Sequence, residues 1–305
     1  MPKILTKDNG LQMISGGCAG CVEVAIMHPL DLIKTRLQIQ SNASRGSANH
    51  YNGVGDCMVK MYRQEGLKSY WKGIIPPLCV ETPKRAWKFG TYEIFKTQMG
   101  YRRDGSMTFG QMATVNLMAG MGSGVTEAII VNPFEVVKVK MQSNRSHQSA
   151  RPTTWSVARE IIREDGMGRN GLLGKGLTAT IGRNGAFNTI YFGFFYTVVH
   201  NTETLENKWL ELARKFALGF ISGTMASIFN IPFDVAKSRI QGPQPEPGKI
   251  AYRGTFRTIG MVYSKEGFAA LYKGLVPKIM RLGPGGAIML IVKDYVFDHL
   301  KVRFP

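Results

Sequence analysis

The chain is poor in cysteine, and its few cysteines form no recognisable framework. Four cysteines in 305 residues, Cys18, Cys21, Cys57 and Cys79, are too few to hold a chain of this length together by disulfides. Cys18 and Cys21 have CxxC spacing, but they lie in a glycine-rich helical segment without the βαβ context of a redox motif. We therefore predict that these cysteines are small packing residues.

Catalytic, nucleotide-binding and metal-binding motifs are absent as well. The sequence has no GxSxG or Walker motif, and Gly120, Gly122 and Gly124 do not follow a predicted strand as a dinucleotide-binding loop does. The five histidines have no spacing typical of metal ligands. The sequence therefore predicts a protein that is not an enzyme and that needs no cofactor or metal.

Long runs that are apolar on every side are also missing. The mean hydropathy is only -0.09, although 44% of the residues are hydrophobic and 35 are glycine. This composition excludes a disordered chain, and it excludes lipid-embedded helices that are apolar all round. Any membrane-spanning helix must keep a polar face turned toward a water-filled interior, where ionisable side chains are tolerated and usually functional.

Acidic residues are scarce: 21 stand against 39 lysines and arginines, which gives a net charge of +18. There is no zinc-finger, RNP or helix-turn-helix signature, so we predict no nucleic-acid partner. An anionic membrane surface or an anionic solute explains better why the basic residues gather beside connecting segments. Examples of this gathering are Lys84, Arg85, Lys88, Arg253 and Arg257.

What the sequence does contain is one pattern repeated three times. It is centred on Pro29, Pro133 and Pro232, which are spaced by roughly 100 residues. At two, five, seven and nine residues after each proline stand an acid, a lysine, a second base and a glutamine. These residues are Asp31, Lys34, Arg36 and Gln38, then Glu135, Lys138, Lys140 and Gln142, then Asp234, Lys237, Arg239 and Gln241. We predict a single transmembrane domain over residues 1-305 with repeats at about 8-100, 108-200 and 208-301.

Each repeat reads as a long helix, a short amphipathic helix and a second long helix. The first long helix carries a pair of glycines that predicts close backbone approach, followed by the proline, which bends the helix. The glycine pairs are Gly16/Gly20, Gly120/Gly124 and Gly219/Gly223. The short helix has an apolar stripe, formed by Val54, Cys57, Met58, Met61 and Tyr62 in the first repeat and by Phe256, Ile259 and Tyr263 in the third. Each long helix has enough residues to cross a hydrocarbon layer of ~30 Å. The fold class is therefore an all-α membrane protein with six transmembrane helices in a pseudo-threefold bundle.

The repeated charges predict a ring of ion pairs. One such motif alone is most simply a solvated helix end. Three bent helices that converge on one axis would instead let each acid meet the lysine of a neighbouring repeat, which closes one side of a passage. Such pairs roughly offset their own desolvation, so the ring can open again. The predicted pairs are Asp31 with Lys138, Glu135 with Lys237, and Asp234 with Lys34, each braced from below by one of the three glutamines.

The triple Pro-x-[Asp/Glu]-x-x-Lys motif, the acidic-Gly turns, the Lys-Gly turns and the threefold length resemble the mitochondrial carrier family, from about Leu11 to Leu300. The resemblance implies a monomeric six-helix bundle in the mitochondrial inner membrane, alternating access, and short helices on the matrix side. It also implies cardiolipin at the Lys-Gly turns, at Gly73, Gly176 and Gly274. In the second repeat Gly174 replaces the aromatic residue before the lysine, which departs from the lipid-binding pattern. The N-terminal MPKILTKDNG fits neither a signal nor a transit peptide, so we expect internal targeting.

Family members carry a second, opposing gate on the even-numbered long helices. Tyr92, Glu93 and Lys96 fit that motif in the first repeat, whereas the second repeat has no charge there and the third keeps only Asp294. A single pair, Lys96 with Asp294, is left to close the cytoplasmic side. We therefore expect a weak cytoplasmic gate that rests open, unless aromatic stacking compensates.

The candidate substrate site follows from matched positions on the even-numbered long helices. Seven residues after each Lys-Gly glycine stand Val80, Arg183 and Arg281, which correspond to the central contact points of carriers. The two arginines have no acidic partner in their own helices, so we expect an anion as their counter-charge. The planar guanidinium group matches the geometry of a carboxylate. The alternative is that they pair with an interior acid such as Glu23 or Glu127. Completing the predicted site are Asn184, Glu81, Arg85 and Lys88, of which Arg85 and Lys88 hold the second carboxylate.

Longer stretches narrow the substrate class. The segments ETPKRA from Glu81, GLTAT from Gly176, IPFDVAKSRIQGPQP from Ile231 and PKIMRLGPGGAIML from Pro277 are similar to family members that exchange 2-oxodicarboxylates. That similarity implies counter-exchange of five- to seven-carbon acids such as 2-oxoadipate and 2-oxoglutarate. The alternatives are a carrier for another di- or tricarboxylate, such as citrate or malate, and a membrane scaffold without transport.

Overall fold

The computed structural model describes residues 7–40, 50–102, 107–143, 152–202, 205–244 and 250–303, so the predicted domain of 1-305 includes segments outside the described residues. Every regular element in the described part is helical. The six long helices there are α1 (Lys7–Ile39), α3 (Ile75–Gln98), α4 (Phe109–Ser143), α6 (Leu177–Asn201), α7 (Lys208–Gln241) and α9 (Leu275–Arg303). The short helices are α2 (Val54–Glu65), α5 (Thr154–Asp165) and α8 (Thr255–Glu266), with 3-10 turns η2 (Leu67–Trp71) and η4 (Phe268–Tyr272).

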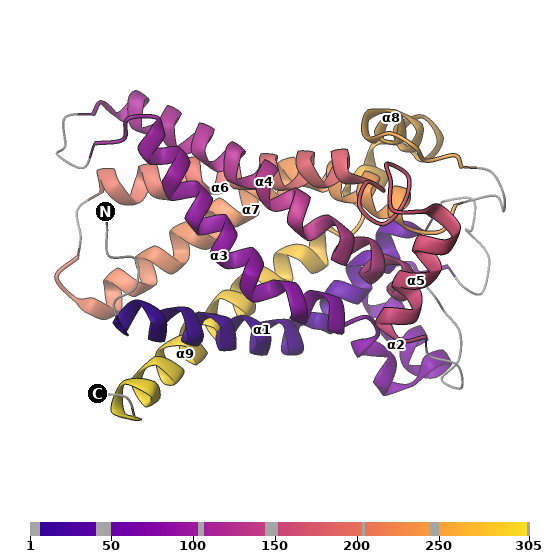
Figure 1. The fold of residues 1–305 in the computed structure, drawn as a ribbon, viewed down its shortest axis with the longest axis horizontal. Helices are drawn as coiled ribbons and strands as arrows, with labels where there is room; N and C mark the ends of the chain where they lie inside the picture. Colours follow the sequence, from indigo (N-terminus) through magenta and orange to yellow (C-terminus); the bar gives the residue numbers. More distant parts are fainter. Residues whose placement is uncertain are drawn as a thin grey trace.

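The long helices form a closed ring. Each packs against the next one along the chain, and α9 returns to α1. The short helices α2, α5 and α8 lie at one end of this bundle, whereas α1 begins and α9 ends at the other (Figure 1). We call these the short-helix end and the terminal end. The order of long, short and long helix in each third of the chain is the one that the sequence pattern predicts, and we call these thirds units one, two and three.

Four of the six long helices are apolar enough to cross a membrane by length and composition. These spans are Ile14–Ile39, Phe109–Ser143, Trp209–Gln241 and Phe268–Lys301. The other two, α3 and α6, have 24 and 25 residues, enough to cross a hydrocarbon layer of ~30 Å, but they do not meet this criterion of length and composition. Charged side chains on α3 and asparagines on α6 contact neighbouring helices inside the bundle, as described below. The low mean hydropathy thus comes from helices with a polar inner face.

Each short helix packs on the first long helix of its own unit. In unit one the contact is a cluster that includes Leu32, Ile33, Cys57, Met61 and Tyr70, and units two and three have equivalent clusters. The predicted apolar stripe is therefore only partly directed inward. In unit three Thr255, Thr258 and Val262 are buried and Ile259 packs against the cluster, whereas the rest of the predicted stripe faces outward. The exposed residues of the predicted stripes are Met58, Tyr62, Phe256 and Tyr263. These helices are apolar on two sides, and the protein covers one of them.

The glycine pairs differ among the units. In unit two a Cβ atom added at Gly120 would lie 2.5 Å from the backbone oxygen of Asn188, and one at Gly124 would lie 2.5 Å from that of Asn184. The backbones of α4 and α6 therefore touch, as the small-residue pattern predicts. At Gly16 in unit one nothing lies within 4 Å, and Gly20 faces only the side chains of Glu81 and Arg85. The prediction of close backbone approach is thus corrected to unit two alone, because polar side chains separate α1 from α3.

Candidate functional site

The three predicted acid–lysine pairs are in contact at the short-helix end. Each pair joins the first long helices of two different units. The Nζ atom of Lys34 lies 2.7 Å from Asp234, that of Lys138 lies 3.0 Å from Asp31, and that of Lys237 lies 2.6 Å from Glu135. All six side chains are at most 20% exposed. The ring therefore links α1, α4 and α7 just beyond their internal prolines.

The Lys-Gly turns position the units against one another next to this ring. Gly73, Gly176 and Gly274 have φ angles of 75°, 71° and 86°, the left-handed region that favours glycine. Each lies against a glutamine of the next unit: Gly73 against Gln142, Gly176 against Gln241, and Gly274 against Gln38. A side chain at any of these glycines would press on the first long helix of the neighbouring unit.

The glutamine brace predicted beneath the ion pairs is corrected by these contacts. Gln38 accepts a hydrogen bond from Ser238 at 2.8 Å, and Gln241 donates to Asn132 and to the Lys175 carbonyl at 3.1 Å each. The amide of Gln142 is buried without a hydrogen-bond partner. Among the described residues the glutamines therefore bond to partners around the Lys-Gly turns and not to the ion pairs, although Gln38 and Lys34 lie side by side against Gly274.

The two matched arginines lie directly against the ring. Arg281 reaches Asp31 with its Nη1 atom at 2.5 Å and Glu23 with its Nη2 atom at 2.9 Å. Arg183 contacts Glu135 at 2.7 Å, and its Nε donates to Asn184 at 2.9 Å. The expectation that these arginines lack an acidic partner holds only within their own helices, because α1 and α4 supply the acids. Val80, the third matched residue, is buried and adds no charge.

The charged residues of α3 form a second cluster beside the first. Arg85 donates to Glu81 at 2.6 Å and also pairs with Glu23. Lys88 instead lies over aromatic rings of α6, with its Nζ 5.1 Å from the ring centroid of Phe192 and 5.4 Å from that of Phe187. Guanidinium, ammonium and aromatic groups thus gather on the inner faces of α3, α6 and α9, which is an arrangement suited to a carboxylate-bearing solute.

One charged residue of this region was missed by the sequence reasoning. Lys278 lies 2.7 Å from Asp234, the same acid that pairs with Lys34. The available signal was its place three residues before Arg281, which puts both cations on one face of α9. The ring at the short-helix end is therefore reinforced by side chains from the second long helices.

The residues predicted for a cytoplasmic gate are not gathered at one point. Tyr92 is fully buried, donates to Asn116 at 2.9 Å and stacks on Tyr196 with 5.2 Å between centroids. Lys96 is buried with its Nζ 3.8 Å from the Tyr101 ring centroid. Glu93 and Asp294 are exposed. The aromatic stacking allowed for in the prediction is present, and it joins α3 and α6 without α9.

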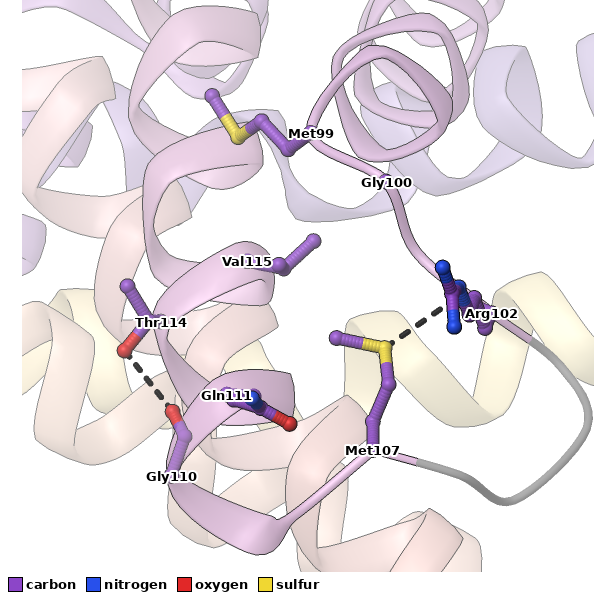
Figure 2. Close-up of a pocket in the computed structure, with 8 residues that line it drawn as sticks. All are labelled: Met99, Gly100, Arg102, Met107, Gly110, Gln111, Thr114 and Val115. Carbon is purple, nitrogen blue, oxygen red and sulfur yellow. Dashed lines mark hydrogen bonds between the residues drawn. The ribbon is translucent and has the colours of Figure 1, made fainter.

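Two surface pockets lie outside the cluster of charges. Figure 2 shows the larger one, of about 680 Å³, at the terminal end between the end of α3 and the start of α4. Among the described residues that line it, Arg102 is the charged one, and none of these residues belongs to the predicted site. The smaller pocket, of about 130 Å³, lies at the Lys-Gly turn of unit one. It is lined by Trp71, Lys72, Gly73, Ile74, Ile75, Met141 and Pro152.

Comparisons with known proteins agree with the threefold organisation. The sequence profile described as mitochondrial carrier protein matches residues 6–103, 111–204 and 208–303. The chain is 52% identical over 290 residues to the mitochondrial 2-oxodicarboxylate carrier of Rattus norvegicus, covering 95% of this chain and 94% of the relative. The protein of that name in Homo sapiens is 52% identical over 97% and 96% of the two chains. The mitochondrial citrate transporter D of Aspergillus niger is 35% identical over 96% and 94%.

Proposed function

This chain belongs to the mitochondrial carrier family, and we propose that it exchanges 2-oxodicarboxylates of five to seven carbons, such as 2-oxoadipate and 2-oxoglutarate. Membership makes it a multi-pass transporter of the mitochondrial inner membrane and not an enzyme. The observation that supports the substrate class is the layer of Arg85, Arg183 and Arg281 inside the bundle, together with 52% identity over nearly the whole chain to relatives named for these substrates.

In this proposal one carboxylate of the substrate is held by Arg183, Asn184 and Arg281. The other is held by Arg85 and Lys88, and Glu81 orients the guanidinium of Arg85 through their ion pair. The planar guanidinium groups give orientation as well as binding energy. The three arginines contact acidic side chains of the protein, so a substrate must replace some of those contacts. Binding in the mM range yields only about 4 kcal/mol, and tighter contacts in an occluded state are needed to drive the change of access.

We assign the ring of Asp31, Lys138, Glu135, Lys237, Asp234 and Lys34 to the matrix gate. Partly buried ion pairs of this kind are only marginally favourable in total, which suits a closure that must open in every cycle. Arg183 contacts the ring acid Glu135 and Arg281 contacts the ring acid Asp31, so a substrate that attracts these arginines would weaken the ring. The structure with all three pairs formed then corresponds to a carrier closed toward the matrix.

The opposite gate works differently in this proposal. The aromatic cluster of Tyr92, Phe192 and Tyr196 already joins α3 to α6, with Lys96 lying over the rings. Closure toward the cytosol then requires α9 to approach this cluster and bring Asp294 toward Lys96. One charge pair and aromatic packing would take the place of a second complete ring.

We further propose that cardiolipin binds at the Lys-Gly turns, at Gly73, Gly176 and Gly274. The pocket at Gly73 supports this, because the starts of α3 and α5 both border it and helix N-termini attract phosphate. In unit two the turn has Gly174 where the aromatic residue is expected, and Lys175 pairs with Asp165 at 2.9 Å. We therefore expect weaker lipid binding at Gly176 than at the other two turns.

The proposal is tested by counter-exchange in proteoliposomes. The purified protein should exchange labelled 2-oxoglutarate against internal diacids of five to seven carbons, and Arg281→Ala and Arg183→Ala should each lower the rate by about tenfold or more, the loss of one charge-assisted contact. Citrate uptake without 2-oxoglutarate exchange would favour the second candidate, which the 35% identity to a citrate transporter supports.

The gate assignment has its own test. Asp31→Lys places two lysines together and should impair exchange, and adding Lys138→Asp should restore part of it. If the reversed pair is no better than Asp31→Lys alone, the assignment of this contact to a gate is wrong.

A further inference from the structure

The carboxylate of Glu23 lies between two of the proposed substrate-binding arginines. Its Oε1 accepts a hydrogen bond from Nη2 of Arg281 at 2.9 Å, and its Oε2 accepts one from Nη2 of Arg85. The Glu23 side chain is only 10% exposed. One acid of α1 thereby bridges α3 and α9, the two helices that flank α1 in the ring.

Glu23 lies where Arg85 and Arg281 can both donate to one carboxylate. Arg85 has a second acid in Glu81 at 2.6 Å, and Arg281 has a second acid in Asp31 at 2.5 Å. Each guanidinium can therefore give up Glu23 and keep one anionic partner. The Glu23 carboxylate receives donors from two guanidinium groups, which satisfies both of its oxygens.

We propose that Glu23 is an internal competitor for the substrate: it holds both Arg85 and Arg281, and the substrate displaces it when one of its carboxylates takes Arg281 and the other takes Arg85. This inference rests on the proposed function, because it takes the same arginines as the substrate site. Glu23 then sets the affinity for the anion, since every binding event must first break its two charge-assisted hydrogen bonds.

The other units show that the fold does not require this contact. Glu127 occupies the same place in unit two, six residues before the internal proline, and Ala226 occupies it in unit three. The Arg85 position is Asn188 in unit two, which donates to Glu127 at 3.0 Å, and Gly286 in unit three. Only in unit one does this acid meet an arginine, so the contact belongs to the solute site and not to the repeat.

The Glu23 carboxylate lies against Gly285 of α9, which has no side chain to displace it. A Cβ atom added at Gly285 of α9 would lie 3.2 Å from the Oε1 atom of Glu23, which is tighter than ordinary van der Waals contact. Gly285→Ala should therefore displace the carboxylate by a few tenths of an ångström. This variant weakens the proposed competition without removing a charge.

The experiment measures KM and kcat for counter-exchange in proteoliposomes containing the full-length protein with Glu23→Gln. We expect KM to fall roughly three- to tenfold, the size of one partly screened charge-assisted hydrogen bond, and kcat to fall because release becomes slower. Gly285→Ala should move both constants in the same direction and by less. In detergent, the rise in melting temperature on adding 2-oxoglutarate should be larger for Glu23→Gln than for the unaltered protein.

Glu127→Gln is the matched control, because it removes the same charge from the symmetry-related position, where the acid accepts from Asn188 and interacts with Lys88 and Arg183 only at longer range. Its KM should stay within about twofold of the unaltered value, as expected for a contact with a neutral amide. An equal fall in KM for both glutamate variants would overturn the proposal in favour of a general charge effect. An unchanged or raised KM for Glu23→Gln would also overturn it.

The outcome can be separated from a failure of the proposed function. The unaltered protein is first tested with 2-oxoglutarate, 2-oxoadipate, citrate and malate. If it exchanges citrate and not the oxoacids, the proposed substrate class is wrong, and the variants are compared with labelled citrate. If Glu23→Gln is not recovered as folded protein, Gly285→Ala decides, and a KM equal to that of the unaltered protein counts against the proposal.

Discussion

The long helices of unit two, α4 and α6, meet backbone to backbone, whereas those of units one and three meet through side chains. Gly120 and Gly124 touch carbonyls of α6, but Gly20 and Gly223 face the side chains of Glu81, Arg85 and Leu282. The sequence motif is the same in all three units, so the residues on the second helix decide how closely the pair packs. The threefold motif therefore does not imply threefold rigidity.

The second helices differ in a way that fits this contrast. Pro83 lies inside α3 and Pro284 lies inside α9, each ten residues after the Lys-Gly glycine of its unit. The equivalent residue of α6 is Ala186. A proline removes one hydrogen bond of the helix and permits a bend, so α3 and α9 have a hinge that α6 lacks. We infer that unit two is the most rigid of the three.

At the short-helix end the contrast runs the other way. Arg36 pairs with Glu65, and Arg239 pairs with Glu266, with all four side chains at most 5% exposed. The corresponding Lys140 of unit two contacts Glu160 and Glu164, whose side chains are 48% and 57% exposed. Arg239 also donates to the carbonyls of Gln38 and Gln40, so it fastens unit three to the end of α1. Unit two is thus tight along its long helices and loose at its short helix.

The largest effect that tests this contrast is expected at Arg239. Arg239→Ala leaves the buried Glu266 with Lys273 as a remaining partner and takes a donor from the carbonyls of Gln38 and Gln40. Loss of this buried pair should cost about 3–5 kcal/mol of stability. Lys140→Ala removes a contact with exposed acids and should cost under about 1 kcal/mol. Thermal unfolding followed by circular dichroism in detergent measures both. Equal losses would show that the exposed and the buried pairs contribute alike.

The next effect is expected at Ala186. Ala186→Pro would remove an internal hydrogen bond of α6 and clash with the preceding turn, at a cost of about 3 kcal/mol or more. The carbonyls of Asn184 and Asn188, two residues before and two residues after Ala186, lie against Gly124 and Gly120. A bend of α6 at this point would therefore break its contact with α4. The control is Pro284→Ala in α9, which should be stable but slower in exchange. If Ala186→Pro is as stable as the unaltered protein, unit two is not the rigid unit.

Sequence reasoning reached the pattern that repeats and missed the contacts that do not. Asp31 with Lys138 could be predicted because three copies of one motif must meet symmetrically around an axis. The sequence offers the pairing of Arg281 with Glu23 only as an alternative, since Glu23 lies more than two hundred residues away in the chain and periodicity gives the face of a helix but not its neighbour. Spacing could place Lys278 on the face of Arg281 but could not give Asp234 as its partner, and the partners of the glutamines were hidden for the same reason. The gate and substrate roles themselves stay predictions until transport is measured.

A smaller effect is expected from the glycines that distinguish the units. Gly124→Ala adds a methyl group against the backbone of Asn184 and Gly185, which cannot rotate away, and should destabilise by about 1–3 kcal/mol. Gly16→Ala meets nothing within 4 Å and should be neutral or slightly stabilising, since alanine favours a helix. The difference between the two melting temperatures is the measurement. A larger loss at Gly16 would contradict the closer packing of unit two.

The smallest effect is a pH dependence of the buried acid in unit three. Burial raises the pKa of Glu266, but hydrogen bonds from Arg239 and Lys273 outweigh it and hold that pKa below its ordinary value of 4.5. An acid whose pKa is lower in the folded state stabilises the fold above its unfolded pKa, and this contribution is lost as the pH falls through the folded value. The melting-temperature difference between the unaltered protein and Glu266→Gln should therefore be largest near neutral pH and shrink below pH 4.5.

The matched residue in unit two is Asp165, whose side chain is 33% exposed and pairs with Lys175. Asp165→Asn should give a smaller melting-temperature difference at neutral pH, because water screens a pair this exposed. If the Glu266 difference stayed constant down to the lowest pH at which the protein remains folded, the contribution of Glu266 would be packing and not charge. The buried contact between Arg239 and Glu266 would then stabilise unit three by shape alone, and the contrast with unit two would be one of burial rather than of electrostatics.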